Sequence, residues 1–298
     1  MPNKKIVLAF GFHEEASDVD FLRRLASEQH IDAIGLELSV EDNEKEVYEQ
    51  SLENGIIRKT NFPKFYMELL AFIKEYEVIP KILGVYSKNE LDYLTETMQV
   101  QNKLLQDSLY ELQHKKNLDK VVKNATVSIK LAALRNNIRE DRLVKVVSQT
   151  MQELEEHPKL RHQLETVMLA SLGEAHYPIY GKIAESSQQI EVKQRFQYGQ
   201  PFMLYYDLLI IKLEQDNKSK IEPMEAARAI YGVLLYGIAH KLHGYSRIDS
   251  INLSNDLVSR LSIRDMGELT RKLVPRNPQD NARIIWDYAH ERVQRLSQ

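Results

Sequence analysis

The feature that most constrains the fold is a strand, turn and helix pattern that occurs twice. Residues 5–10 form a continuous apolar run rich in branched side chains, which is typical of a buried strand. An amphipathic segment at 19–29 and a second strand at 31–38 follow and predict a βαβ unit. Strand, glycine turn, short helix and strand return between 165 and 193. We therefore expect an α/β fold with a mixed or parallel sheet built from two similar units.

The segment between the two units predicts a long helical hairpin. From Asn89 to about Gln113, apolar residues recur at spacings of three, four and seven, which gives a helix with a narrow apolar seam. A second helical stretch runs from 118 to 154, whereas 78–86 is a short strand that Pro80 interrupts. After residue 200 the helical segments are expected at 202–213, 223–242, 254–273 and 278–296.

These patterns predict two regions. Residues 1–200 are expected to form an α/β domain with the hairpin inserted as a helical arm at about 89–158. Residues 201–298 are expected to form a helical C-terminal region packed on that domain. The apolar seam of the arm packs either against its own hairpin partner or against a second copy of the chain, which would give a homodimer.

Composition and charge exclude several classes of function. Forty basic and 43 acidic residues give a net charge of -3, unlike a basic nucleic-acid-binding domain. The absence of cysteine excludes disulfides and a cysteine nucleophile. No secretory signal is evident, and the longest uncharged apolar stretch, 229–239, is shorter than the ~20 residues that span a bilayer. We expect a cytoplasmic protein without membrane insertion or a nucleic-acid partner.

A glycine and a histidine follow the first strand of each unit. The pairs are Gly11 with His13 and Gly173 with His176. Strand ends at the carboxyl edge of a parallel sheet are where open α/β folds bind ligands, and a neutral imidazole acts as a base or a metal ligand. Histidines from adjacent strands would converge on one cleft. Gly-x-x-His is a weak pattern by itself, and Phe10 stands where a strict repeat has glycine.

A glutamate and two arginines extend this candidate site. Glu37 lies at the end of the second strand. We expect its carboxylate to pair with an arginine, to bind a metal, to orient a histidine or, as the alternative, to face solvent. In the second long helix, Arg135 and Arg139 continue the apolar row of Leu143 and Val147. Their guanidinium groups either extend to solvent or meet Glu37 or a substrate anion in the cleft. A purely structural helical scaffold would instead leave Glu37 and Arg139 far apart.

The order of His13, Glu37, Arg139 and His176 resembles that of the TraB/PrgY, Tiki, ChaN-like and erythromycin esterase-like superfamily. The matching stretches, which lie between about 5 and 195, are FGFHEEASDVDFLRR, IDAIGLELS, NNIREDRLVKVV and LASLGEAHYPIYGKI. Three positions depart from the family pattern, namely Phe10 for glycine, Glu140 for aspartate and Leu143 for methionine. Dinucleotide, P-loop and Gly-x-Ser-x-Gly motifs are absent from the sequence.

The resemblance implies a hydrolytic or metal-binding site. Our leading hypothesis is a hydrolase of an ester or amide bond that acts on a small molecule or peptide, with His13, Glu37, Arg139 and His176 as catalytic residues. His13, Glu37 and His176 would bind manganese, zinc or iron, and Arg139 would stabilise an oxyanion. Nearby groups with supporting roles are Glu14, Arg135, Glu174 and Tyr177. The alternative is a non-catalytic protein that binds a ligand or haem, or a regulator that keeps the same cleft.

Overall fold

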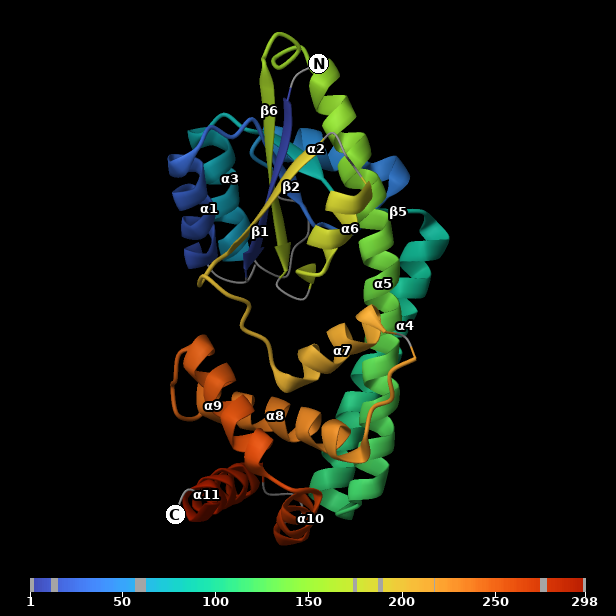
Figure 1. Ribbon diagram of the computed structural model, residues 1–298, viewed down its shortest axis with the longest axis vertical. Helices are drawn as coiled ribbons and strands as arrows, with labels where there is room; N and C mark the ends of the chain where they lie inside the picture. Colours follow the sequence, from blue (N-terminus) through green and yellow to red (C-terminus); the bar gives the residue numbers. More distant parts are fainter. Residues whose placement is uncertain are drawn as a thin grey trace. The chain divides into compact units, whose positions relative to one another are not determined.

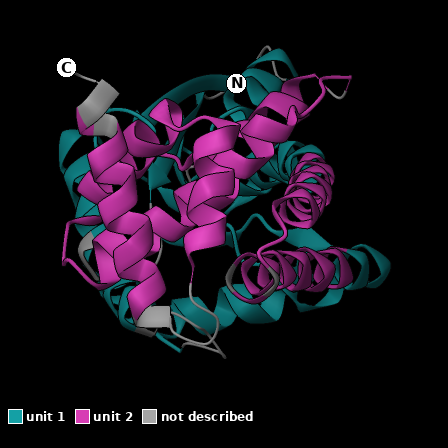
Figure 2. Cartoon of the chain, turned by 90° about the horizontal axis from the view of Figure 1, so that it is seen from below, with its two compact units in different colours: residues 1–93, 138–201 teal, residues 94–137, 202–298 magenta. Residues whose placement is uncertain are grey.

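The computed structural model describes residues 3–11, 16–56, 63–173, 176–186, 190–216, 218–273 and 278–296. The chain divides into two compact units, coloured separately in Figure 2. Unit 1 contains residues 1–93 and 138–201, and unit 2 contains residues 94–137 and 202–298. The helical arm is thus shared between the two units. The predicted packing of the C-terminal region on the α/β domain stays a prediction.

Unit 1 contains the expected α/β sheet, whose five strands are all parallel. The strand order is β4-β2-β6-β1-β7. The strands are β1 (Asn3–Gly11), β2 (Ala33–Leu36), β4 (Ile79–Ile82), β6 (Glu165–Gly173) and β7 (Ile190–Phe196). A separate parallel pair is formed by β3 (Val40–Glu41) and β5 (Val85–Tyr86).

The two βαβ units interlock within this sheet. Strand β1 pairs with β6 along its length, and the outer neighbours β7 and β2 each pair with the first strand of the other unit. In this register Gly11 is the partner of Gly173. The two glycines that precede the predicted histidines therefore lie at the same level of adjacent strands, at their carboxyl ends. This adjacency is what the repeated pattern predicts.

Helices cover both faces of the sheet. The helices of unit 1 are α1 (Ala16–Glu28), the short η1 (Asp42–Glu44), α2 (Lys45–Glu53), α3 (Pro63–Glu75) and α6 (Ile179–Ser186), with parts of α4 (Lys88–Tyr110) and α5 (Leu118–Glu156). Figure 1 shows α1 and α3 on one side of the strands and α5 and α6 on the other. Two successive residues of β1 confirm this arrangement, because side chains alternate between the two faces of a strand. Lys4 pairs with Glu155 of α5, and Lys5 donates to Gln29 just after α1.

Unit 2 is helical and has its own core. The π-helical turn η2 (Glu111–Lys115) follows α4, and the C-terminal helices are α7 (Tyr205–Gln215), α8 (Pro223–Lys241), α9 (Arg247–Arg260), α10 (Ile263–Lys272) and α11 (Pro278–Leu296). Leu105 and Leu109 of the predicted seam pack against the core that contains Val121 and Ala125 of α5. Part of the seam is therefore covered by its own hairpin partner.

Two predicted elements differ in the structure. The helix expected at 254–273 is two helices, α9 and α10, because Leu261 is extended and Ser262 caps a new helix. The strand expected at 78–86 is divided into β4 and β5, which belong to different sheets. Pro80 lies inside β4, which is tolerated because β4 is an edge strand. None of the described helices is long and apolar enough to cross a membrane.

Candidate functional site

Three of the predicted site residues meet at the carboxyl ends of β2 and β6. Glu37 directly follows β2, and His176 follows β6, the neighbouring strand. Arg139 comes from α5, which packs on the sheet through Leu143 and Val147 of the same helix face. The sequence separations are long, so only the parallel register of the sheet and the packing of α5 bring these side chains together.

The carboxylate of Glu37 is the centre of the site. One of its oxygens, Oε1, accepts a hydrogen bond from Arg139 and lies 3.0 Å from Nε2 of His176. The other, Oε2, accepts from the backbone N–H of Gly173 at 3.5 Å. The side chains of His176 and Glu37 are only 4% and 6% exposed. At that burial a charged carboxylate requires a charged or hydrogen-bonding partner; Arg139 supplies the charge, and His176 and the N–H of Gly173 add polar contacts.

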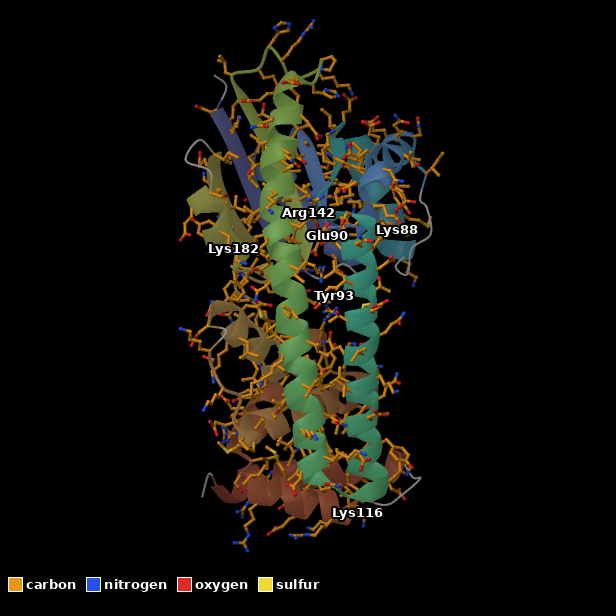
Figure 3. The ribbon with its side chains drawn as sticks, turned by 90° about the vertical axis from the view of Figure 1, so that its right-hand side faces the viewer. Lys88, Glu90, Tyr93, Lys116, Arg142 and Lys182 are labelled. Atoms are coloured by element: carbon orange, nitrogen blue, oxygen red, sulfur yellow. The ribbon has the colours of Figure 1, made fainter. Side chains whose placement is uncertain are left out.

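Arg142 fixes the position of α5 beside the carboxylate of Glu37. Its Nε donates to the carbonyl oxygen of Val85 at 2.7 Å, and its guanidinium also pairs with Asp42 at 2.8 Å. Figure 3 labels Arg142 on α5 and Lys182 on α6. Because Arg142 lies one helical turn after Arg139, its attachment to β5 fixes the part of α5 that presents Arg139.

A second carboxylate extends the site on the other side of His176. Glu140 is fully buried, and its Oε1 lies 3.9 Å from Nδ1 of His176. Lys182 of α6 pairs with Glu140 at 2.9 Å and with Asp141 at 3.2 Å. Neither Glu140 nor Lys182 was predicted as a site residue. The signal for Glu140 is its position on the same apolar row as Leu143 and Val147, where a carboxylate is unusual.

These charges shift the ionisation of their neighbours. Burial by itself lowers the pKa of His176, but the charge of Glu37 and the carboxylate of Glu140 outweigh it, so the pKa is raised. Burial and then the charge of Glu37 raise the pKa of the Tyr66 phenol to about 12. Burial also raises the pKa of Tyr86, although Arg139 acts in the opposite direction. The pKa of His176 thus lies above its ordinary value, and both phenols stay protonated at neutral pH.

Two buried nitrogens of the site lack a hydrogen-bond partner among the described residues. They are Nδ1 of His176 and Nε of Arg139. Buried polar atoms are nearly always hydrogen-bonded in proteins, so two such nitrogens in one ionic cluster need an explanation. One is a proton-exchanging ring nitrogen and the other is a cationic donor. A buried water molecule is the usual partner of such atoms.

The remaining predicted residues have different outcomes. His13, Glu14 and Glu174 lie outside the described residues, so their predicted roles stay predictions. Arg135 belongs to unit 2, where its charge acts on the phenol of Tyr206. Tyr177 directly follows His176 and lines a pocket of unit 1.

A metal ion does not fit the two described members of the predicted ligand set. Nε2 of His176 faces the Oε1 of Glu37 that also accepts from Arg139, so the nitrogen carries a proton and the oxygen is already paired with a cation. A bound metal would need both partners to separate. In the described ranges, no group of three or more metal-ligating side chains gathers to hold an ion. The three-ligand set with His13 stays a prediction.

No protein-family model, curated protein or solved structure matches this chain. The resemblance to the TraB, Tiki, ChaN-like and erythromycin esterase-like superfamily therefore stays a prediction. The pairing of Glu37 with Arg139 and His176 stands on the geometry of the site alone.

Proposed function

We propose that this chain hydrolyses an ester or amide bond at the carboxyl ends of β2 and β6. The observation that carries the proposal is the Glu37–His176 pair, with a separation of 3.0 Å and with Nδ1 of the ring left without a hydrogen-bond partner among the described residues. In this pair Glu37 orients the imidazole, and Nδ1, which lies 3.9 Å from Oε1 of Glu140, exchanges a proton with water or with the leaving group. A small ester or a peptide is the proposed substrate.

Arg139 has two roles in this proposal. Its ion pair with Glu37 keeps that carboxylate ionised and fixed toward His176. Its Nε is the donor left for the negative charge that develops on a carbonyl oxygen during attack. Hydrolysis of an ester or amide needs both an activated water and a positive group at that oxygen, which is why His176 and Arg139 are proposed to act together.

The experiment is a turnover assay with a panel of aryl and alkyl esters and short peptides, with and without added manganese. We expect His176→Asn to lower turnover at least about a hundredfold, the usual contribution of a general acid or base. Glu37→Gln and Arg139→Lys are expected to lower it less. The matched control is His162→Asn, an exposed histidine of unit 1. Turnover that is equal in His176→Asn and the unchanged protein would refute the proposal.

The second candidate is a non-catalytic protein that keeps the same cluster to bind a ligand or haem or to regulate a partner. Its support is the near-complete burial of His176 and Glu37, whose charges are paired with each other and with Arg139. It requires that Glu37→Gln destabilises the fold while no substrate of the panel is turned over. Dimerisation through the arm belongs to this candidate and is tested by sedimentation of the full chain.

A further inference from the structure

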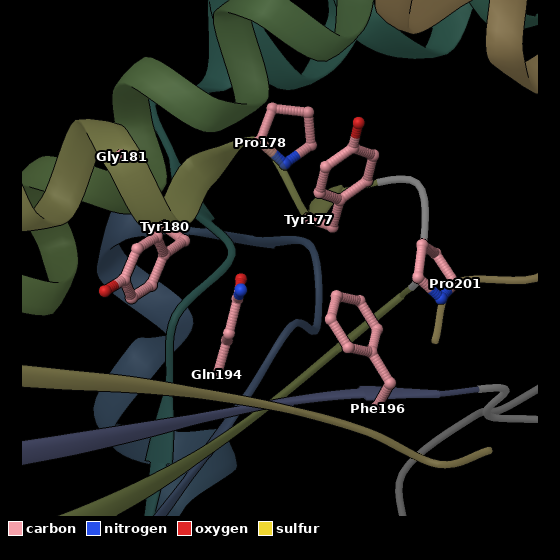
Figure 4. Close-up of a pocket in the computed structure, with 7 residues that line it drawn as sticks. All are labelled: Tyr177, Pro178, Tyr180, Gly181, Gln194, Phe196 and Pro201. Atoms are coloured by element: carbon pink, nitrogen blue, oxygen red, sulfur yellow. The ribbon is translucent and has the colours of Figure 1, made fainter. Parts of the chain in front are cut away.

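The pocket that begins at Tyr177 lies on the face of the sheet covered by α6. It has a volume of about 430 Å³ and is lined by Tyr177, Pro178, Tyr180, Gly181, Gln194, Phe196 and Pro201 (Figure 4). This volume is in the range of small-molecule sites. None of the described residues that line it carries a charge. The first of them is bonded to His176, so the pocket starts one residue from the proposed catalytic ring.

The aromatic rings of the pocket are held in place by their neighbours. Phe196 stacks on Phe10 of β1, with a centroid distance of 5.3 Å and an interplanar angle of 25°. Tyr177 meets Phe196 in an edge contact at 6.4 Å and 62°. Phe10 is the residue that replaces the glycine of a strict repeat, and this replacement provides the ring that supports Phe196. A preformed arrangement of rings loses little freedom when a ligand binds.

Polar groups stand among these rings. Gln194 precedes Phe196 by two residues on the same face of β7, and Figure 4 shows its side chain between Tyr180 and Phe196. The amide both donates and accepts hydrogen bonds, and the tyrosine hydroxyls do the same. In the part of the lining that the structure describes, the pocket thus offers aromatic faces and neutral hydrogen-bonding groups, but no ion-pair partner for a charged ligand.

We propose that this pocket binds an uncharged aromatic group that carries a hydrogen-bonding substituent. Stacking against Tyr177, Tyr180 or Phe196 holds the ring, and Gln194 pairs with the substituent. If the bound ring is the aryl group of a substrate, this proposal rests on the proposed hydrolytic function. A charged group is disfavoured because burying it without a partner is costly.

Gly181 offers a direct steric test. A Cβ built at Gly181 meets no atom within 4 Å, so the backbone position tolerates a side chain. Because Gly181 lines the pocket, a larger side chain there is expected to reduce its volume. Leucine is also a better helix former than glycine, so Gly181→Leu is expected to preserve α6. The matched control is Gly237→Leu, because Gly237 is also a half-buried glycine within a helix, α8, with open space at its Cβ.

The probe is benzamide, with benzoate and acetamide as its charged and non-aromatic analogues, and binding to the full chain is measured by NMR titration. We expect benzamide to bind the unchanged protein and Gly237→Leu equally and Gly181→Leu at least about tenfold more weakly, a difference of about 1.4 kcal/mol. Benzoate and acetamide should bind more weakly than benzamide. No measurable benzamide binding, equal binding in Gly181→Leu, or benzoate binding as tight as benzamide would each overturn the proposal.

A turnover arm separates this proposal from the proposed function. If benzamide binding is lost in Gly181→Leu but no ester is hydrolysed by the unchanged protein, the pocket proposal is supported and the proposed hydrolytic function is wrong. If esters are hydrolysed but Gly181→Leu changes neither benzamide binding nor the preference for aryl over alkyl esters, the hydrolase stands and the pocket proposal is wrong.

Discussion

At the scale of single residues, the site is defined by how Glu37 is neutralised. Its side chain is 6% exposed, and its carboxylate faces the guanidinium group of Arg139 and the imidazole of His176. A pair of this kind contributes little when it is compared with a well-packed apolar replacement, but removing one partner leaves a buried charge uncompensated. A variant that removes only the carboxylate is therefore expected to lower the free energy of unfolding.

We predict that Glu37→Ala lowers the free energy of unfolding by about 3 to 5 kcal/mol, because Arg139 and His176 lose their shared partner. Urea unfolding followed by circular dichroism measures this. The control is Asp256→Ala, which breaks an ion pair with Arg260 whose carboxylate is 49% exposed, and little change is expected there. Equal effects of the two substitutions would mean that Glu37 is not held in a buried ion pair.

A second residue-scale prediction concerns Asp207, the third residue of α7. Burial raises the pKa of its carboxyl from 3.8 to about 6, against the hydrogen bond from Leu204 and the charge of Arg247. The folded state therefore binds more protons than the unfolded state between these values, and stability falls as pH rises from about 4 to about 6. Asp207→Asn should remove this dependence.

The expected gain for Asp207→Asn at neutral pH is at most about 3 kcal/mol, since one pKa unit is about 1.4 kcal/mol. Urea unfolding at several pH values between about 4 and 7 measures the slope. An unchanged slope in Asp207→Asn would show that another group causes the dependence.

At this scale the sequence predicted the central trio but missed its surroundings. Glu37, Arg139 and His176 could be named because each follows a strand or continues a helix row whose direction is set by local periodicity. Lys182 and Tyr66 could not, because their approach to the site depends on how α6 and α3 pack on the sheet. Glu140 could have been predicted from the sequence, since a carboxylate on an apolar helix row requires a buried partner.

At the scale of elements, periodicity located most helices and strands, whereas their ends depended on local hydrogen bonds. The predicted helix at 254–273 failed where Ser262 begins α10. Oγ of Ser262 accepts from the backbone N–H of Asp265 at 3.2 Å, and Oδ2 of Asp265 accepts from the N–H of Ser262 at 2.9 Å. This reciprocal pair is a capping box, which the Ser-x-x-Asp spacing in the sequence could have indicated.

We predict that Ser262→Ala lowers the stability of unit 2 by about 1 kcal/mol, because the N-terminal N–H groups of α10 lose an acceptor. Thermal or urea unfolding measures the change. Ser259→Ala is the control, since Ser259 lies within α9 and its hydroxyl donates to the carbonyl oxygen of Asp256 in the same helix. Alanine favours helix more than serine, so this control should be neutral or slightly stabilising. A loss of similar size in both variants would argue against the cap.

At the scale of the whole molecule, the chain crosses between its two compact units three times. Each unit has its own apolar core, built around the sheet in unit 1 and around α8 in unit 2. The sequence predicted an α/β region and a helical region but not the division of the arm, because a long helix has the same periodicity on both sides of that boundary. Only three-dimensional contacts assign residues 94–137 to the helical unit.

We predict that core substitutions act mainly within their own unit. Leu169→Ala in β6 and Leu235→Ala in α8 each remove a fully buried side chain and should cost about 2 to 5 kcal/mol. Hydrogen exchange followed by mass spectrometry should show faster exchange in unit 1 for the first variant and in unit 2 for the second. Equal acceleration throughout the chain in both variants would mean that the two units unfold as one.

The interlocked order of the sheet also governs how this chain is made. Strand β1 is translated before the other strands of the sheet, yet both of its neighbours, β6 and β7, are encoded after the whole helical arm. Strand β2 likewise lacks its neighbour β6 until that strand has been translated. During synthesis β1 therefore lacks both of its neighbours, and β2 lacks one of its two, until β6, which begins at Glu165, has been translated. Protection of this nascent segment from aggregation is a requirement that the finished fold no longer reveals.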